Sequence, residues 1–272
     1  MPKTFLGSDR PTASLAFFFL FAPNNSGSTV MSQYLAEQAG AYLPPYGNNE
    51  GQAVPAVRKM MLVRARWQKK HPMDWPRIRR AWEDAAGGQP FVEASPPNLV
   101  RVDSIAEVFG ADSTALLSIC DPYQQMASCL RRYCQPGFEV TRLVRQWVRK
   151  ARLLRRVQKA YPWFPLIRYD DFVADPTVLN RYLGLPVRPS RVRGKKGSGA
   201  QGISDLRPVT TLFLTEAEID ALSAALTPHQ TLVTHFGYRV AGAADLIADL
   251  DRVPGALAAA RQRRRDWEAL AA

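Results

Sequence analysis

The residues best suited to chemistry follow an apolar segment near the N-terminus. Residues 15–22 lead into a short turn of amide, hydroxyl and glycine residues, namely Asn24, Asn25, Ser26, Gly27, Ser28 and Thr29. Where a strand enters a helix through such a turn, the first N–H groups of the helix lack intrahelical partners and face any bound oxyanion. The three hydroxyl groups add further donors. The pattern predicts a phosphate-binding turn.

This turn differs from the nucleoside triphosphate loop that it superficially resembles. A Walker loop has Gly, four residues, Gly-Lys and then Ser or Thr. The segment here has neither the first Gly nor the Lys. The turn is therefore not an ordinary nucleoside triphosphatase loop, and the missing Lys also opposes the alternative of a P-loop kinase.

The positions of other apolar runs predict what surrounds the turn. Residues 15–22, 91–93, 114–120 and 166–169 are apolar and alternate with amphipathic segments. Such alternation indicates an α/β fold of three layers, in which helices cover both faces of a central parallel sheet. Ligands of these folds bind at the carboxyl ends of the strands, so the segments after all four runs should gather there.

Each of these segments also has a plain structural interpretation. Asp121 followed by Pro122 is a typical helix start, and Asn98 suits the cap of a helix that ends at Phe109. Tyr169 fits a buried strand end, and Glu93 taken alone is best explained as a strand-end residue. Only their combination favours a shared site.

Taken in order, the segments resemble motifs of the sulfotransferases that use 3'-phosphoadenosine 5'-phosphosulfate. The turn resembles the family's Pro-x-(Arg or Lys)-Ser-Gly-Thr-Thr, with Pro23 at its start, and residues 91–98 resemble the Glu-Lys-Ser-Pro-Pro-Asn of many bacterial members. Cys120 and Ser128 occupy the positions of the Arg and Ser that bind the 3'-phosphate.

The resemblance extends to two further segments. Tyr169 matches a tyrosine that lies against the adenine, and its ring could stack on a base. Lys195, Lys196 and Gly197 are similar to the Arg-Lys-Gly that closes over the 3'-phosphate. The resemblance therefore implies a P-loop-like sulfotransferase architecture and this nucleotide as co-substrate, with no metal.

The implied reaction moves a sulfuryl group to a hydroxyl or amine acceptor, which needs a base to take the acceptor's proton. Glu50 lies where a Glu serves as that base in family members acting on glycans or tyrosine. A carboxylate that caps the helix beginning near Pro55 explains Glu50 equally well. His71 is the second candidate.

Three departures from the family pattern bear on activity. Asn25, Ala94 and Cys120 each stand where a cation usually contacts the nucleotide. Candidates to replace these cations are Arg101, Arg131, Arg132, Lys195 and Lys196. A protein that has kept the fold and binds without catalysis is therefore the main alternative to an active enzyme.

Size and charge complete the expectations. The 272 residues, 46% of them hydrophobic, suit a single domain spanning 1–272, with a helical excursion at 42–89 and a helical tail from 241. A net charge of +12 favours an anionic partner, here the nucleotide, although a nucleic-acid-associated protein without a recognised motif is a remote alternative. Residues 15–22 are too few to span a membrane, and we expect a cytoplasmic protein with reduced cysteines.

Overall fold

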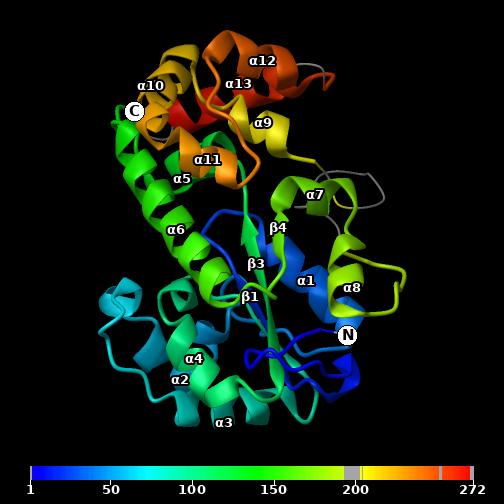
Figure 1. Ribbon diagram of the computed structural model, residues 1–272. Coiled ribbons are helices and arrows are strands. Elements are labelled where there is room, and N and C mark those ends of the chain that lie inside the picture. The colour runs from blue at the N-terminus through cyan, green and yellow to red at the C-terminus, as the bar shows by residue number, and fades with distance from the viewer. Residues whose placement is uncertain (1, 193–202, 204, 251–252, 270–272) are drawn as a thin grey trace. The chain divides into compact units, whose positions relative to one another are not determined.

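A computed structural model describes residues 2–192, 203, 205–250 and 253–269 of the chain (Figure 1). Its centre is a sheet of four parallel strands in the order β2-β1-β3-β4. The strands are β1 (Phe17–Phe21), β2 (Phe91–Glu93), β3 (Ser113–Ile119) and β4 (Leu166–Arg168). The predicted parallel sheet is confirmed, and each strand lies within one or two residues of an apolar run in the sequence.

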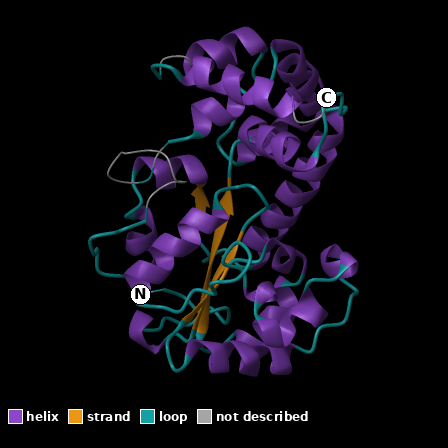
Figure 2. Ribbon diagram, turned by 180° about the vertical axis from the view of Figure 1, so that it is seen from behind, coloured by secondary structure: helices purple, strands orange, loops and turns teal. Residues whose placement is uncertain are grey.

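Every residue of β1, β2 and β3 is buried, which explains why apolar and polar residues do not alternate along these strands. Phe19 pairs with Glu93 of β2 and with Ala115 of β3. Because all the strands run in one direction, their carboxyl ends lie at one edge of the sheet. The segments that follow β1, β2 and β4 therefore start from that edge (Figure 2).

Helices cover both faces of the sheet, as the sequence predicts. Figure 1 shows α1 (Ser28–Ala39) and α8 (Val178–Leu183) on one side, with α3 (Trp75–Ala86) and α4 (Val102–Phe109) on the other. On the α3 and α4 side, Phe17 packs edge-to-face on Phe109 at 4.9 Å between ring centroids, and Trp82 stacks on Phe91 at 5.2 Å. These buried rings form the core on this face of the sheet.

The chain divides into two compact units. The first is Met1–Ile119 with Leu153–Ser204, and the second is Cys120–Arg152 with Asp205–Ala272. Besides the sheet and the four helices above, the first unit has η1 (Thr12–Ser14), η2 (Gly51–Ala53), α2 (Pro55–Met61), η3 (Arg64–Trp67), η4 (Pro96–Val100) and α7 (Tyr169–Ala174). Residues 42–89 thus contain η2, α2, η3 and α3.

The second unit is helical. It contains α5 (Pro122–Tyr133), most of α6 (Thr141–Ala160), α9 (Arg207–Thr211), α10 (Glu216–Leu226), η5 (Thr227–His229), α11 (Gln230–His235), α12 (Ala243–Leu250) and α13 (Ala256–Ala269). The start of α5 is as predicted, because Asp121 accepts hydrogen bonds from the N–H groups of Tyr123 and Gln124, and Pro122 is the first helical residue.

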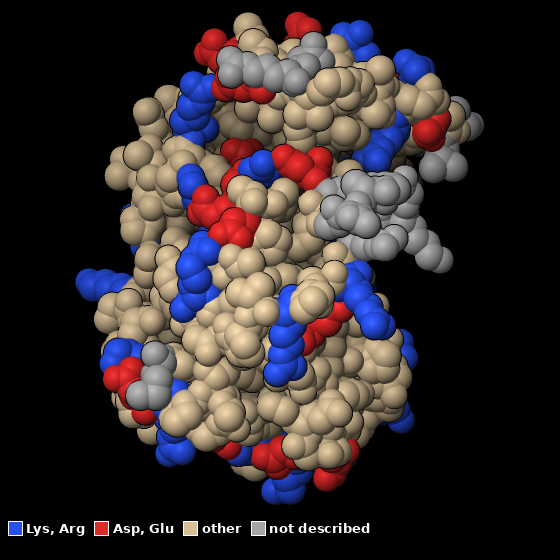
Figure 3. All heavy atoms as spheres, turned by 90° about the vertical axis from the view of Figure 1, so that its right-hand side faces the viewer, with Lys and Arg blue, Asp and Glu red and all other residues tan. Residues whose placement is uncertain are grey.

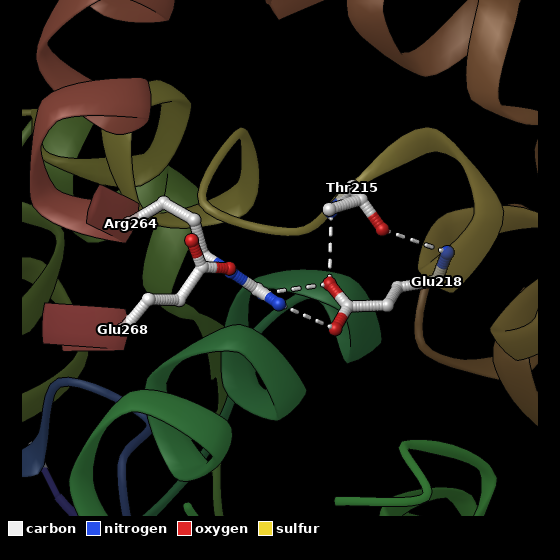
Figure 4. A network of polar contacts seen from close by, with 4 residues as sticks. All are labelled: Thr215, Glu218, Arg264 and Glu268. Atoms are coloured by element: carbon white, nitrogen blue, oxygen red, sulfur yellow. Dashed lines mark hydrogen bonds and ion pairs between the residues drawn. The ribbon is translucent and has the colours of Figure 1, made fainter. Parts of the chain in front are cut away.

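An arginine network joins α10 to α13 within this unit (Figure 4). Arg264 donates to both carboxylate oxygens of Glu218, at 2.9 and 3.1 Å, and forms an ion pair of 2.6 Å with Glu268. Glu218 also completes a capping box with Thr215 at the start of α10. Because Arg264 is committed to these carboxylates, we assign it a structural role.

No described helix is both long and apolar enough to cross a membrane. Among the described residues, no group of three or more His, Cys, Asp or Glu is arranged to hold a metal ion. Figure 3 shows Lys and Arg side chains interspersed with Asp and Glu over one face of the molecule. On that face the excess positive charge does not form one continuous patch.

Candidate functional site

The turn after β1 contains two residues with left-handed backbone and leads directly into the N-terminus of α1. Asn25 and Gly27 both have positive φ angles, of 60° and 83°. Gly27 is the N-cap residue of α1 and makes no side-chain cap hydrogen bond. The first N–H groups of α1 are therefore not capped by a side chain of that residue, and the helix dipole adds partial positive charge at this end.

The three hydroxyl residues of the turn differ in their surroundings. Ser26 is buried, and its hydroxyl donates to the carbonyl oxygen of Pro23 at 2.5 Å, which helps to fix the turn. Ser28 is the first residue of α1 and Thr29 the second, and Thr29 is only half-buried. Ser26 therefore shapes the turn, whereas Ser28 and Thr29 lie at the helix end where an oxyanion would bind.

Tyr169 lies directly against this turn. It is the first residue of α7, immediately after β4, and only 9% of it is exposed. A Cβ atom added to Gly27 would lie 2.1 Å from Cε2 of Tyr169, closer than any real contact. Glycine is thus required here both by its positive φ and by the ring. The structure brings together two parts of the predicted nucleotide site that are 142 residues apart in the chain.

Glu50, the predicted base, is held near α1 by the residue before it. Gln33 of α1 donates to the side-chain oxygen of Asn49 at 3.0 Å, and the Asn49 amide donates to the carbonyl oxygen of Pro44 at 2.9 Å. Glu50 itself is half-buried and accepts a hydrogen bond from the side-chain amide of Gln52.

The alternative interpretation of Glu50 as a helix cap does not hold. The N-cap residue of α2 is Val54, and that helix start has no side-chain cap hydrogen bond. Glu50 is instead the N-cap residue of η2, where it makes no side-chain cap hydrogen bond. His71, the second candidate base, lies between η3 and α3, where it is half-buried.

Glu93, at the end of β2, is a residue whose importance sequence reasoning missed. Its carboxylate is fully buried and accepts hydrogen bonds from the N–H of Gly51 at 2.6 Å and the N–H of Ser95 at 2.8 Å. The side-chain amide of Asn98 donates to it as well, at 2.8 Å. No local signal reveals this, because Gly51 is 42 residues away.

The expectation that Asn98 caps the following helix is wrong. Asn98 lies within η4, its side chain is turned to Glu93, and α4 begins after Arg101 with no side-chain cap. A buried carboxylate without a cation needs donors, and the Asn98 amide supplies one.

Burial raises the pKa of Glu93 to about 7. Hydrogen bonds from the side chain and backbone of Ser95 oppose this shift, the negative charge of Glu50 adds to it, and the Gly51 N–H opposes it again. Glu93 therefore titrates near neutral pH.

Arg101 is not available to replace the missing cations. It is only 3% exposed, and its guanidinium donates to the carbonyl oxygens of Arg66, Pro97 and Gln68. Burial lowers its pKa. This arginine holds η3 against η4 instead of contacting a nucleotide.

Ser128 lies on α5, in the second unit, together with two arginines on one helical face. Arg131 and Arg132 follow it by three and four residues, the spacing that places side chains side by side on a helix. Burial lowers the pKa of Arg131, and the positive charges of Arg263 and Arg132 lower it further. The positive charges of Arg131, Arg132 and Arg263 therefore lie near one another in the second unit. Lys195, Lys196 and Gly197 lie outside the described residues.

Comparisons with known proteins identify the fold. No family model matches the sequence, and no curated protein matches it either. Among solved structures, the chain is similar to a sulfotransferase from Alicyclobacillus acidocaldarius, with a TM-score of 0.51 and 15% identity over 85% of this chain and 97% of that one. This likeness shows that the chain has a sulfotransferase fold.

Two other solved structures are similar over comparable lengths. The sulfotransferase domain from the curacin biosynthetic pathway matches with a TM-score of 0.49 and 17% identity, covering 86% of this chain and 100% of that one. The sulfotransferase domain from the Synechococcus PCC 7002 olefin synthase matches with a TM-score of 0.43 and 17% identity, over 95% and 96%.

Proposed function

We propose that the protein is a sulfotransferase that moves a sulfuryl group from 3'-phosphoadenosine 5'-phosphosulfate to a hydroxyl or amine acceptor. The observation that carries this proposal is the packing of Tyr169 on Gly27 in a chain with a sulfotransferase fold. It joins a base-stacking ring to a phosphate-binding turn. We include a cytoplasmic location in the proposal.

The turn after β1 would bind the 5'-phosphosulfate. Backbone N–H groups at the start of α1 and the hydroxyls of Ser28 and Thr29 supply donors, and Ser26 fixes the turn through Pro23. Asn24 and Asn25 complete the loop, with a neutral amide at Asn25 where relatives place a cation. Gly27 suits this turn because it allows both the positive φ angle and the close packing of the Tyr169 ring.

The 3'-phosphate and the base would take the remaining predicted residues. Ser128 can donate a hydrogen bond to the 3'-phosphate, and Arg131 and Arg132 can supply charge from the same helical face. Lys195, Lys196 and Gly197 remain assigned to it by resemblance. Tyr169 would lie against the adenine.

Glu50 would act as the base. The donor supplies a sulfuryl group whose sulfur–oxygen bond to phosphate breaks as the acceptor oxygen or nitrogen attaches. The Glu50 carboxylate would take the proton that this acceptor atom loses. Its half-buried position and its anchoring through Asn49 and Gln52 support this role, and no metal is needed.

Transfer of radioactive sulfur tests the proposal. The protein would be incubated with donor labelled in the sulfuryl group and with a panel of phenols, sugars and amines, and labelled product would be measured. We expect transfer to at least one class of acceptor, with Glu50→Gln reducing kcat by about a hundredfold or more. Absence of labelled product from every acceptor class, with donor intact, would contradict catalysis.

A binding protein without transfer activity is the second candidate. The commitment of Arg101 to backbone carbonyls favours it, because one potential replacement for the missing cations is unavailable. This candidate predicts tight binding of 3'-phosphoadenosine 5'-phosphate with no labelled product.

A further inference from the structure

We propose that Glu93 is the positioning residue for Glu50, because it fixes the backbone of the segment that carries the Glu50 side chain. The role of Glu50 as base rests on the proposed function above. The placement of the segment by Glu93 does not, and it can be tested without any substrate.

All the groups that the structure shows pointing at the Glu93 carboxylate are donors. One oxygen accepts from the N–H of Gly51, and the other accepts from the N–H of Ser95 and the amide of Asn98. An ionised carboxylate has about four acceptor positions and can satisfy them all. A neutral amide in its place would turn an NH₂ group toward at least one N–H, leaving a buried donor unsatisfied.

Both backbone polar groups of Gly51, the residue after Glu50, are hydrogen-bonded to side chains. Its N–H donates to Glu93 at 2.6 Å, and its carbonyl oxygen accepts from the indole N–H of Trp82 at 3.1 Å. The approach is so close that a Cβ atom on Gly51 would lie 2.0 Å from the Glu93 carboxylate oxygen and 2.9 Å from the Trp82 ring. Only glycine fits this position.

The residues on either side of Glu50 and Gly51 are also hydrogen-bonded to other parts of the first unit. The N–H of Gln52 donates to the hydroxyl oxygen of Ser95 at 3.1 Å, and the hydroxyl of Ser95 in turn bonds to Glu93. Asn49, on the other side of Glu50, is bonded to Gln33 of α1. Glu50 is therefore the residue between two anchored positions, and β2 and α1 together set where its carboxylate lies.

The charge of Glu93 controls this attachment. Among the described residues, the charged side chain of Glu50 raises the pKa of Glu93, whereas Gly51, Trp82, Ser95 and Asn98 are neutral. Because the pKa of Glu93 lies at about 7, the ionised form that satisfies all the donors predominates only above neutral pH. We expect activity to fall as pH falls through this value.

Glu93→Gln tests the proposal, and Glu218→Gln is the matched control. Glu218 is also a hydrogen-bonded Glu with a structural role, but it lies in the second unit, where its bonds are to Arg264 and Thr215. Hydrogen exchange of the Gly51 and Gln52 amides would be measured on full-length protein without substrate. We expect exchange at these amides to be about tenfold faster in Glu93→Gln and unchanged in Glu218→Gln.

Kinetics with the acceptor found above give a second readout. A positioning role predicts that Glu93→Gln lowers kcat by about tenfold or more and removes the dependence on pH near 7, while affinity for 3'-phosphoadenosine 5'-phosphate changes by less than about twofold. Unaltered amide exchange in Glu93→Gln would overturn the proposal. Inactivity of the wild type toward every acceptor would instead overturn the proposed function and leave the exchange result intact.

A milder variant covers the case in which Glu93→Gln does not fold. Ser95→Ala removes the acceptor of the Gln52 N–H and the hydroxyl that bonds to Glu93, but it keeps the hydrogen bond from the Gly51 N–H to the Glu93 carboxylate. We expect faster exchange at Gln52 than at Gly51 in this variant. Equal protection of Gln52 in Ser95→Ala and in the wild type would argue against the proposal.

Discussion

The buried carboxylate of Glu93 accepts a 2.6 Å hydrogen bond from the backbone N–H of Gly51, the residue that follows Glu50. This bond connects the end of β2 to the excursion that leaves α1. It places the predicted base on a segment whose backbone is fixed from two directions. The chemistry proposed for Glu50 therefore depends on residues that touch no substrate.

Gly51→Ala should disturb this segment through a steric clash, because the mutation removes no hydrogen-bonding group. The added methyl group would lie 2.0 Å from the Glu93 carboxylate, so we expect a loss of about 1–3 kcal/mol in the free energy of unfolding, measured with denaturant. Gly242→Ala is the control, since its Cβ would meet its nearest neighbour at 3.9 Å. Equal stability of the two variants would show that the Gly51 segment is not closely packed.

Gly27→Ala should weaken nucleotide binding because the added methyl group would meet the Tyr169 ring, and not only because the alanine would be strained at a positive φ angle. Gly27 and Gly137 have φ angles of 83° and 82°, but a Cβ on Gly137 would meet nothing within 4 Å, whereas one on Gly27 would enter the Tyr169 ring. Both alanine variants carry about 1–2 kcal/mol of strain. Titration with 3'-phosphoadenosine 5'-phosphate should show weaker binding only for Gly27→Ala, and a similar loss in both would contradict the ring contact.

The raised pKa of Glu93 predicts a particular dependence of stability on pH. A Glu with an ordinary pKa of 4.5 and a folded-state pKa of about 7 binds its proton more tightly when folded. Its contribution to stability is therefore fully present below pH 4.5 and is lost as pH rises through about 7, a change of about 3 kcal/mol at most.

Denaturant unfolding at pH 5 and pH 8 measures this effect. The decrease in unfolding free energy between the two should be smaller in Glu93→Gln than in the wild type, because the amide does not titrate. The same decrease in both proteins would mean that the Glu93 pKa is not raised.

The strands could be predicted because burial on both faces leaves a direct trace in the sequence. Phe17–Phe21 consists of apolar residues only, and Phe91–Glu93 begins with two apolar residues. The pair Asp121 and Pro122 marks a helix start through its local chemistry alone. These features need no knowledge of distant residues.

The hydrogen bonds that hold the backbone next to Glu50 could not be predicted, because they join residues far apart in the sequence, such as Gly51 and Glu93. Asn is a residue type that often caps helices, yet the side-chain amide of Asn98 donates a hydrogen bond to the buried carboxylate of Glu93 instead. Arg101 likewise resembles a free cation in the sequence, but it binds the carbonyl oxygens of η3. Local preference gives way where a buried charged group must be satisfied.

Arg131→Ala tests the cation cluster on α5. Removing this charge beside Ser128 should weaken binding of 3'-phosphoadenosine 5'-phosphate by about tenfold, and the loss should shrink at high salt. Arg142→Ala is the control, because Arg142 is exposed and already paired with Glu139. Weakening of the same size in both variants would indicate a general effect of net charge.

We propose above all that the chain binds a 3',5'-bisphosphorylated adenosine. Calorimetric titration of the wild type with 3'-phosphoadenosine 5'-phosphate and with adenosine 5'-phosphate tests it most directly. We predict that the 3'-phosphate increases affinity by about tenfold or more, since it adds charge-assisted hydrogen bonds. Equal affinity for the two nucleotides, or no heat with either, would contradict the account.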